Sequence, residues 1–197
     1  HPRLMLLDEP FSALDAGLRE ATRKSVSRVL TLAGITTILV THDQAEALSF
    51  GDQVAALRAG RVVQAGPPAE LYFHPTDRET ALFMGDAIVL PASFGDNFVD
   101  CALGKVSADT AGHQGTGDIM LRPEQLRLSI PAAAGQSAAA RVTAVEFGGA
   151  SGMVTVRLDG SDRPVTIRTS AFEAPEVGDA VHIGVTGKAH IFGRPKA

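Results

Sequence analysis

Cysteine pairs, long apolar runs and an excess of basic charge are all missing from this sequence. Cys101 is the only cysteine among 197 residues, so no internal disulfide can form, and a reducing compartment is permitted. No stretch approaches the ~18 consecutive apolar residues that a membrane-spanning helix needs, and nothing at the amino end resembles a signal peptide. We therefore expect any membrane association to depend on a partner protein.

Charge and histidine placement exclude two further classes of partner. The chain carries 18 Lys and Arg against 22 Asp and Glu, a formal net charge of −4. Nucleic-acid binding needs clustered basic residues that neutralise phosphates, so we expect no nucleic-acid partner. The histidines also stand apart from other potential ligands, so we expect no resident metal cluster of His, Cys, Asp and Glu. The isolated histidines are His74, His113, His182 and His190.

A phosphate-binding P-loop is missing as well. That loop needs the pattern Gly-x-x-x-x-Gly-Lys-Ser/Thr, whose backbone N–H groups and lysine cradle the phosphates of a nucleotide. The nearest match is Gly187-Lys188, but Ala189 replaces the hydroxyl residue and His182 replaces the first glycine. We therefore expect no nucleotide hydrolysis by the chain as given.

The sequence does contain two apolar runs that end in titratable residues. Residues 4–7 are apolar and are followed by Asp8 and Glu9, which is typical of a strand buried on both faces with carboxylates at its carboxyl end. A second run, residues 35–41, ends in His42. The helical apolar pattern between them, which Gly34 should end, predicts a βαβ unit with parallel strands. Ligands of open α/β sheets bind at such carboxyl ends.

Local signals predict the elements that follow. Asp43 should cap a short helix that Gly51 ends, and residues 53–58 and 61–65 should pair as a hairpin. Pro67 and Pro68 should open another short helix. A capping box from Thr76 to Glu79 should begin the last helix of this part of the chain.

From residue 88 onward, short β-rich segments alternate with Gly, Pro, Asp and Ser. Strands at a spacing of roughly ten residues favour a small barrel or sandwich. The small residues 132–140 should form a loop between its halves. The predicted strands are residues 98–103, 118–122, 126–130, 140–147, 153–158, 165–169, 180–185 and 189–192.

The motifs, in this order, resemble those of the ATP-binding subunit of ABC transporters. Residues 4–9 look like the Walker B strand with its catalytic glutamate, residues 12–15 like the D-loop, and His42 like the switch histidine. Residues 119–126, with Arg122-Pro123-Glu124, resemble part of the TOBE or MOP-like accessory domain of importer ATPases. The implied fold class is α/β followed by all-β. Residues 1–87 would be a partial RecA-like P-loop NTPase sheet without its amino-terminal half, and residues 88–197 an OB/TOBE-like β-barrel.

The resemblance also implies roles for individual residues. Asp8 would hold Mg²⁺ through a water, Glu9 would position the attacking water, and His42 would donate to the γ-phosphate of ATP. Ser12 and Asp15 would contribute to nucleotide binding, Asp15 across a dimer interface. Both cofactors, ATP and Mg²⁺, would require the missing amino-terminal half, because the P-loop and the signature motif precede the Walker B strand in this family. The alternative is that Asp8 and Glu9 cap the next helix and that His42 is a satisfied histidine at a strand end.

Partners and localisation follow from the same resemblance. The expected partners are transmembrane permease subunits, a second copy of the ATPase subunit and, indirectly, a periplasmic solute-binding protein. The subunit would be peripheral, on the cytoplasmic side of the bacterial inner membrane. Residues 70–75, 83–85 and 119–126 resemble importers of several solutes, with the ferric-iron and polyamine branch nearest.

Two other interpretations remain open at this stage. The β-rich part could be a stand-alone regulatory, oligomerisation or oxyanion-binding module in which Arg122, Arg168 and Lys188 ligate an anion, although such residues are more often solvated on a β surface. Arg122 could instead pack its aliphatic stem beside Pro123 while its head meets a carboxylate such as Glu124. The chain could also come from a non-transport ABC ATPase such as a DNA-repair protein, against which the acidic charge and the β-rich tail count. The chain as given also lacks the strands and the P-loop helix that the resemblance implies. We therefore expect four apolar side chains to lack packing partners: Leu6, Ile38, Leu39 and Val40.

Overall fold

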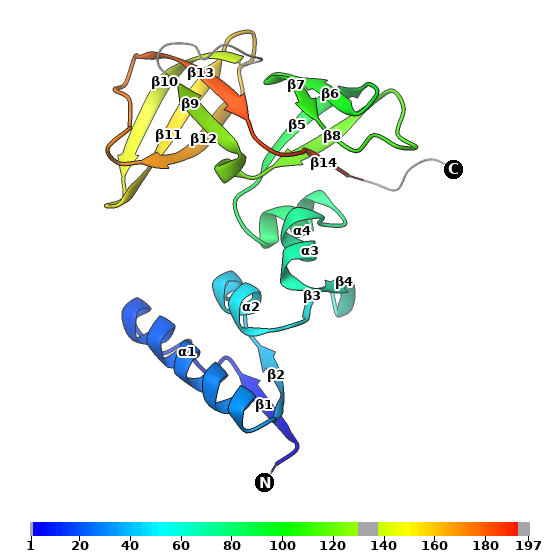
Figure 1. Ribbon diagram of the computed structural model, residues 1–197, viewed down its shortest axis with the longest axis vertical. Helices are drawn as coiled ribbons and strands as arrows, with labels where there is room; N and C mark the ends of the chain where they lie inside the picture. Colours follow the sequence, from blue (N-terminus) through cyan, green and yellow to red (C-terminus); the bar gives the residue numbers. More distant parts are fainter. Residues whose placement is uncertain (1, 130–137, 193–197) are drawn as a thin grey trace. The chain divides into compact units, whose positions relative to one another are not determined.

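The computed structural model describes residues 2–129 and 138–192 (Figure 1). The chain divides into two compact units, one of His1–Thr76 and Phe83–Gly85 and the other of Asp77–Leu82 and Asp86–Ala197. The elements of the first unit are β1 (Leu4–Asp8), α1 (Ala16–Leu32), β2 (Thr36–Val40), α2 (Gln44–Phe50), β3 (Val54–Arg58), β4 (Arg61–Gly66) and α3 (Pro68–Phe73). Helix α4 (Arg78–Phe83) belongs mainly to the second unit, which continues with β5 (Ile88–Phe94), β6 (Phe98–Cys101), β7 (Gly104–Ser107), β8 (Thr116–Leu121), the 3-10 helix η1 (Pro123–Gln125), β9 (Leu126–Ser129), β10 (Ala138–Phe147), β11 (Ser151–Leu158), β12 (Pro164–Ser170), β13 (Ala180–Val185) and β14 (His190–Ile191).

The first unit contains the predicted βαβ arrangement. β1 and β2 pair in parallel, and the register places Asp8 opposite Val40. α1 connects the two strands, and its first turn is capped by Asp15, whose side chain accepts a hydrogen bond from the Leu18 N–H at 3.0 Å. Gly34 follows the helix with a φ of 62°, a left-handed conformation that glycine adopts without a steric penalty. Both ends of α1 therefore follow from local sequence signals.

The two-stranded sheet is covered on one face only. Side chains alternate along a strand, and the exposed set comprises Leu4, Leu6, Ile38 and Val40 at 49%, 68%, 52% and 56%. The prediction of a strand buried on both faces is therefore wrong for residues 4–7 in this chain. The expected loss of packing is found for Leu6, Ile38 and Val40, whereas Leu39 lies on the opposite, half-buried face.

Helix α2 and the β3–β4 hairpin also form where the sequence predicts them. The Asp43 side chain accepts a hydrogen bond from the Glu46 N–H at 3.0 Å, and the helix ends before Gly51. Ala59 and Gly60 join the two strands with φ values of 50° and 73°. Two consecutive residues with positive φ are typical of the tight turns whose twist matches a β-hairpin.

A small apolar cluster holds the hairpin and α3 together. Pro68 stands at the start of α3, where its missing N–H costs no hydrogen bond. The buried residues of the cluster are Ala56, Leu71 and Met84, with Leu48, Val54 and Val63 packed against them. This cluster is much smaller than the core of the second unit.

The second unit is built from two five-stranded sheets. Their strand orders are β14-β8-β5-β6-β7 and β12-β11-β10-β13-β9, and all pairs between consecutive neighbours are antiparallel. Both sheets contribute to one continuous apolar core, which agrees with the predicted all-β second part. The fully buried members of this core include Val99, Ile119, Leu121, Leu126, Val154, Val156, Ile167 and Ile183.

Three predictions for the second unit need correction. Neither β5, which contains Pro91, nor β7 is among the predicted strands, and residues 98–103 form not one strand but β6 and the start of a turn into β7. β5 pairs with β6 only over residues 92–94, so Pro91 needs no N–H on that side. The predicted loop over residues 132–140 lies mostly outside the described residues, and its last three positions belong to β10. Residue 130 of the predicted strand 126–130 also lies outside them.

Arg122 is another correction, because it is not a surface cation. Its side chain is 0% exposed, and Nη1 donates to the carbonyl oxygens of Ala81 at 3.0 Å and Asp86 at 2.8 Å. A guanidinium buried at this depth must use its donors within the protein. The helix that it contacts, α4, is capped by Asp77, which accepts from the Thr80 N–H at 2.8 Å, in place of the predicted Thr76.

Candidate active site

The carboxyl ends of β1 and β2 bring Glu9 and His42 together. The parallel register places Asp8 opposite Val40, and the Glu9 N–H donates to the Val40 carbonyl at 2.8 Å, so both chains leave the sheet at one edge. His42 lies two residues beyond Val40, and its Nδ1 is 2.9 Å from Glu9 Oε1. This contact joins residues 33 positions apart in the sequence.

The pair is accessible and electrostatically coupled. The side chains of His42 and Glu9 are 73% and 45% exposed. The hydrogen bond to Glu9, and next the negative charge of that carboxylate, raise the pKa of His42 above its ordinary value. The raised pKa extends the pH range over which the imidazole is protonated, and in the protonated form both ring nitrogens are hydrogen-bond donors.

The backbone at Glu9 adopts an unusual conformation. Its φ is 44°, which is uncommon for a residue other than glycine. The turn is held by Ser12, whose N–H and hydroxyl donate to the Glu9 carbonyl at 3.2 Å and 2.9 Å. Strained backbone of this kind is found at functional sites when the surroundings fix it. Ser12 therefore shapes the turn that presents the Glu9 side chain.

Asp8 and Asp15 occupy different positions relative to this pair. Asp8 is exposed at the last position of β1, directly before Glu9. Asp15 caps α1, and neither Asp8 nor Asp15 lines the small cavity of about 40 Å³ beside Glu9 and His42. The structure thus brings Asp8, Glu9, Ser12 and His42 to one edge, and it gives Asp15 a capping contact within its own helix.

A set of polar contacts behind His42 was not predicted. Thr41 Oγ1 donates to Glu46 Oε2 at 2.6 Å and accepts from the Asp43 N–H at 3.0 Å, while Arg19 Nη1 lies 3.3 Å from Asp43 Oδ2. Glu46 is only 2% exposed, so the hydroxyl of Thr41 satisfies a buried carboxyl group. Glu46 stands three residues after the cap Asp43, as in a capping box, and this spacing could have drawn attention to Glu46, although here Thr41 Oγ1 lies between the Glu46 carboxylate and the Asp43 N–H. Together these contacts fix the backbone on both sides of His42.

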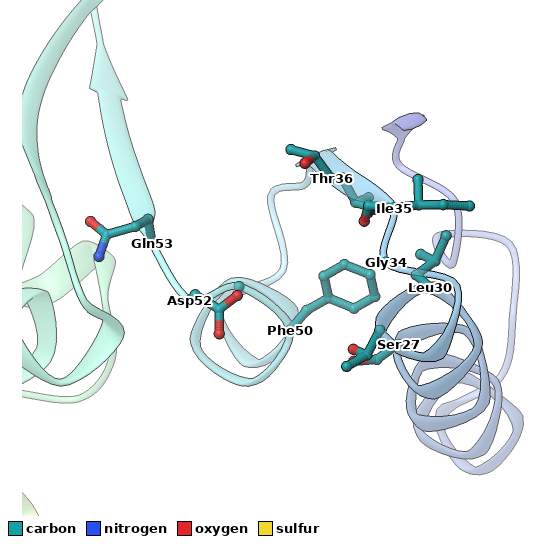
Figure 2. Close-up of a pocket in the computed structure, with 11 residues that line it drawn as sticks. Ser27, Leu30, Gly34, Ile35, Thr36, Phe50, Asp52 and Gln53 are labelled. Carbon is teal, nitrogen blue, oxygen red and sulfur yellow. Dashed lines mark hydrogen bonds between the residues drawn. The ribbon is translucent and has the colours of Figure 1, made fainter. Parts of the chain in front are cut away.

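The cavity drawn in Figure 2 lies elsewhere in the first unit. It has a volume of about 480 Å³ and is lined by the end of α1, the start of β2 and the segment after α2. The Phe50 ring projects into it, and Ser27, Thr36 and Asp52 supply polar groups (Figure 2). Thr36 begins β2, whereas His42 follows its end, so this cavity is not part of the Glu9 and His42 site.

The described residues contain neither a metal-ligand cluster nor a membrane-spanning helix. Across residues 2–129 and 138–192, no three His, Cys, Asp or Glu side chains gather in a way that could hold a metal ion. In the same part of the chain, no helix has the length and apolar character to cross a membrane.

Known proteins resemble both parts of the chain. Residues 119–192 match the TOBE domain family. The chain is 51% identical over 197 residues to the "Fe(3+) ions import ATP-binding protein FbpC" of Pseudomonas fluorescens (strain Pf0-1), a match that covers 98% of this chain and 56% of that protein. A protein of the same name from Serratia marcescens is 48% identical over 193 residues, with 97% and 55% covered. The chain spans about half the length of the curated relatives it matches.

A solved structure resembles part of the chain more distantly. The cytoplasmic molybdate-binding protein ModG, with molybdate bound, matches 53% of this chain and 94% of its own at 12% identity and a TM-score of 0.40. A fold similarity at this level carries no information about a shared ligand.

Proposed function

Because this chain belongs to the ATP-binding proteins of ABC importers, we propose that it forms part of a subunit whose ATP hydrolysis drives the uptake of ferric iron or a similar small solute. The observation that carries the proposal is the 2.9 Å contact between His42 and Glu9 where two parallel strands end. The relatives named as Fe(3+) import proteins supply the solute.

Glu9 and His42 would perform complementary tasks in hydrolysis. The Glu9 carboxylate would orient the attacking water or take its proton. Protonated His42 donates Nδ1–H to Glu9 and keeps a second donor, Nε2–H, for an oxygen of the γ-phosphate. The raised pKa of His42 supports this role, because neutral imidazole has only one N–H.

Three further residues would support ATP hydrolysis without reacting themselves. They are Asp8, Ser12 and Asp15. Asp8 is an exposed carboxylate beside Glu9, which fits a ligand that holds Mg²⁺ through a water. When bound, Mg²⁺ neutralises charge on the phosphates of ATP. Ser12 fixes the turn at Glu9, and Asp15 would act toward the nucleotide site of a second copy of the subunit, with one oxygen engaged in capping α1.

The phosphate cradle would come from outside this chain. No P-loop pattern is present in the sequence, so we propose that the chain alone neither binds nor hydrolyses ATP. The exposed apolar face of β1 and β2 supports this view. So does a cavity of about 550 Å³ lined by β2, α2 and β3, which offers space for further strands.

The proposed assembly has three kinds of partner. Transmembrane permease subunits would carry the solute path, a second copy would complete the nucleotide sites, and a periplasmic solute-binding protein would take part indirectly. The subunit would be attached peripherally to the cytoplasmic side of a bacterial inner membrane. These proposals rest on the import function named for the relatives.

The test restores the amino-terminal half of the subunit and compares Glu9→Gln with wild type. We expect ATP binding to persist and turnover to fall by roughly 10²-fold or more, because a positioned base is lost. Glu20→Gln is the matched control, since Glu20 is exposed on α1 and contacts only Lys24 among the contacts described for it. Wild-type turnover in Glu9→Gln would refute the assignment of Glu9.

The solute requires a separate measurement. Vesicles that contain the reconstituted transporter should accumulate labelled ferric iron when supplied with ATP and solute-binding protein. Uptake of a polyamine or sugar without iron would remove the iron proposal but keep the importer ATPase. A salt-dependent affinity for DNA would favour a DNA-repair ATPase instead.

A further inference from the structure

A groove in the second unit has no role in the proposed ATP chemistry. Its volume is about 590 Å³, within the range of small-molecule sites. One wall comes from α4 and the chain that follows it, and the other from β11, β12 and the residue before β12. The lining includes Arg78, Leu82, Asp86, Ile88, Pro123 and Arg163, and all of the lining residues belong to the second unit.

The first wall is held in place by Arg122. This buried side chain donates to the carbonyl of Ala81, which lies within α4, and to that of Asp86, in the segment between α4 and β5. Hydrogen bonds from a charged donor are stronger than those between neutral groups, and buried ones exchange poorly with water. Pro123, the next residue, lines the groove itself. The groove is therefore preformed, which lowers the entropic cost of binding.

The rim of the groove carries positive charge without a partner. Arg78 and Arg163 are both exposed, and in the described part of the chain neither side chain has an ion pair. The only carboxylate in the lining, Asp86, lies 3.9 Å from Arg168, outside the lining. Apolar side chains also line the groove, among them exposed Leu82 and half-buried Ile88 and Val89. The groove thus combines two guanidinium groups with apolar side chains that a ligand can contact.

We propose that this groove binds a small organic anion with an apolar body. Its carboxylate, or an equivalent acidic group, would contact Arg78 and Arg163, whose planar donors match carboxylate oxygens. Its apolar body would cover Leu82, Ile88 and Val89. An inorganic ion would use the charge but leave these apolar side chains in water, so it fits the lining less well.

The test titrates the full chain with naphthalene-2-carboxylate, naphthalene-2-carboxamide and inorganic phosphate. We expect the carboxylate to bind most tightly, with the neutral amide and phosphate each at least about tenfold weaker. Arg78→Gln and Arg163→Gln should each weaken carboxylate binding about tenfold, the effect of losing one charged hydrogen-bond donor. Both positions are exposed, so circular dichroism should be unchanged.

Arg127→Gln is the matched control. Arg127 is exposed in the same unit, on β9 at the opposite edge of the sheet from β12, and does not line the groove. The affinity of the Arg127→Gln chain for naphthalene-2-carboxylate should equal that of the wild-type chain. Equal losses in all three variants, no binding by the wild type at millimolar carboxylate, or tighter binding of phosphate would each overturn the proposal.

Discussion

At the scale of single residues, the informative feature is a contact between Glu9 and His42, not either residue alone. An Asp-Glu pair after an apolar run is a common pattern, and a histidine after a strand is more common still. The parallel register turns the two patterns into one site, because it sends both chain segments out at the same sheet edge. The strained φ of Glu9 and the hydroxyl of Ser12 then determine where the carboxylate lies.

The contact predicts an altered titration of His42. Glu9 raises the pKa of His42, so its titration midpoint should lie above the ordinary value of 6.5 and return toward it in Glu9→Gln. Because folding raises the pKa of His42, its protonation stabilises the folded chain at pH values below the pKa of the unfolded state. This stabilisation is lost as the pH rises through the pKa of His42 in the folded state. The ring resonances of His42, followed by NMR against pH, measure the shift.

The same titration has a direct control. Glu20→Gln removes a carboxylate of the same unit that pairs with Lys24 and has no contact with His42. It should leave the midpoint of His42 unchanged. A midpoint of 6.5 or lower in the wild-type chain would contradict the Glu9 contact.

At the scale of elements, Arg122 connects two segments that are distant in sequence. Arg122→Leu removes the donors to the Ala81 and Asp86 carbonyls, and it leaves the buried oxygen of Ala81 and the part-buried oxygen of Asp86 without the guanidinium. We expect a loss of roughly 3 kcal/mol or more in the free energy of unfolding of the second unit, since each hydrogen bond to a charged group contributes about 1.5 to 3 kcal/mol. Urea denaturation measures it. Exposed Arg127→Leu should change stability by no more than about 0.5 kcal/mol, and an equal loss in both variants would contradict the role of Arg122.

The elements also show which parts of the fold a sequence can predict. The sequence correctly predicts the helix cap at Asp43, the helix end at Gly34 and the hairpin turn at Ala59-Gly60. Caps and tight turns depend on residues close together in the chain. The resemblance to importer ATP-binding proteins is confirmed as well. Arg122 was misread because burial of arginine is rare and depends on carbonyls about 40 positions away.

The missed elements share that dependence on distant partners. β5 contains Pro91, which has no N–H for a strand pair. The sequence therefore argues against a strand here unless the pairing of β5 is known. At the candidate site, Glu9 and His42 were predicted from motif order, whereas Arg19 was missed. The contact of Arg19 with Asp43 follows from the packing of α1 beside α2, which no spacing in the sequence encodes.

At the scale of the whole molecule, the two units should differ in stability. The second unit has a continuous core drawn from two sheets, whereas the first has a three-residue buried cluster and an apolar sheet face in water. Each apolar side chain of that face that stays exposed forgoes about 1.5 to 3 kcal/mol of burial. We therefore expect limited proteolysis to digest the first unit while the second persists.

The position of the cut tests where the second unit begins. Since Arg122 holds Ala81 and Asp86, the resistant fragment should keep α4 and start near Asp77, not at Ile88 where the motif pattern would divide the chain. Amino-terminal sequencing and the mass of the fragment give the position. In Arg122→Leu the α4 segment loses its anchor, so the start should move beyond Asp86, whereas Arg127→Leu should leave it near Asp77. A wild-type fragment that begins at Ile88 would mean that α4 is not part of the stable unit. Survival of the first unit would mean that the exposed apolar face of β1 and β2 destabilises that unit less than its area implies.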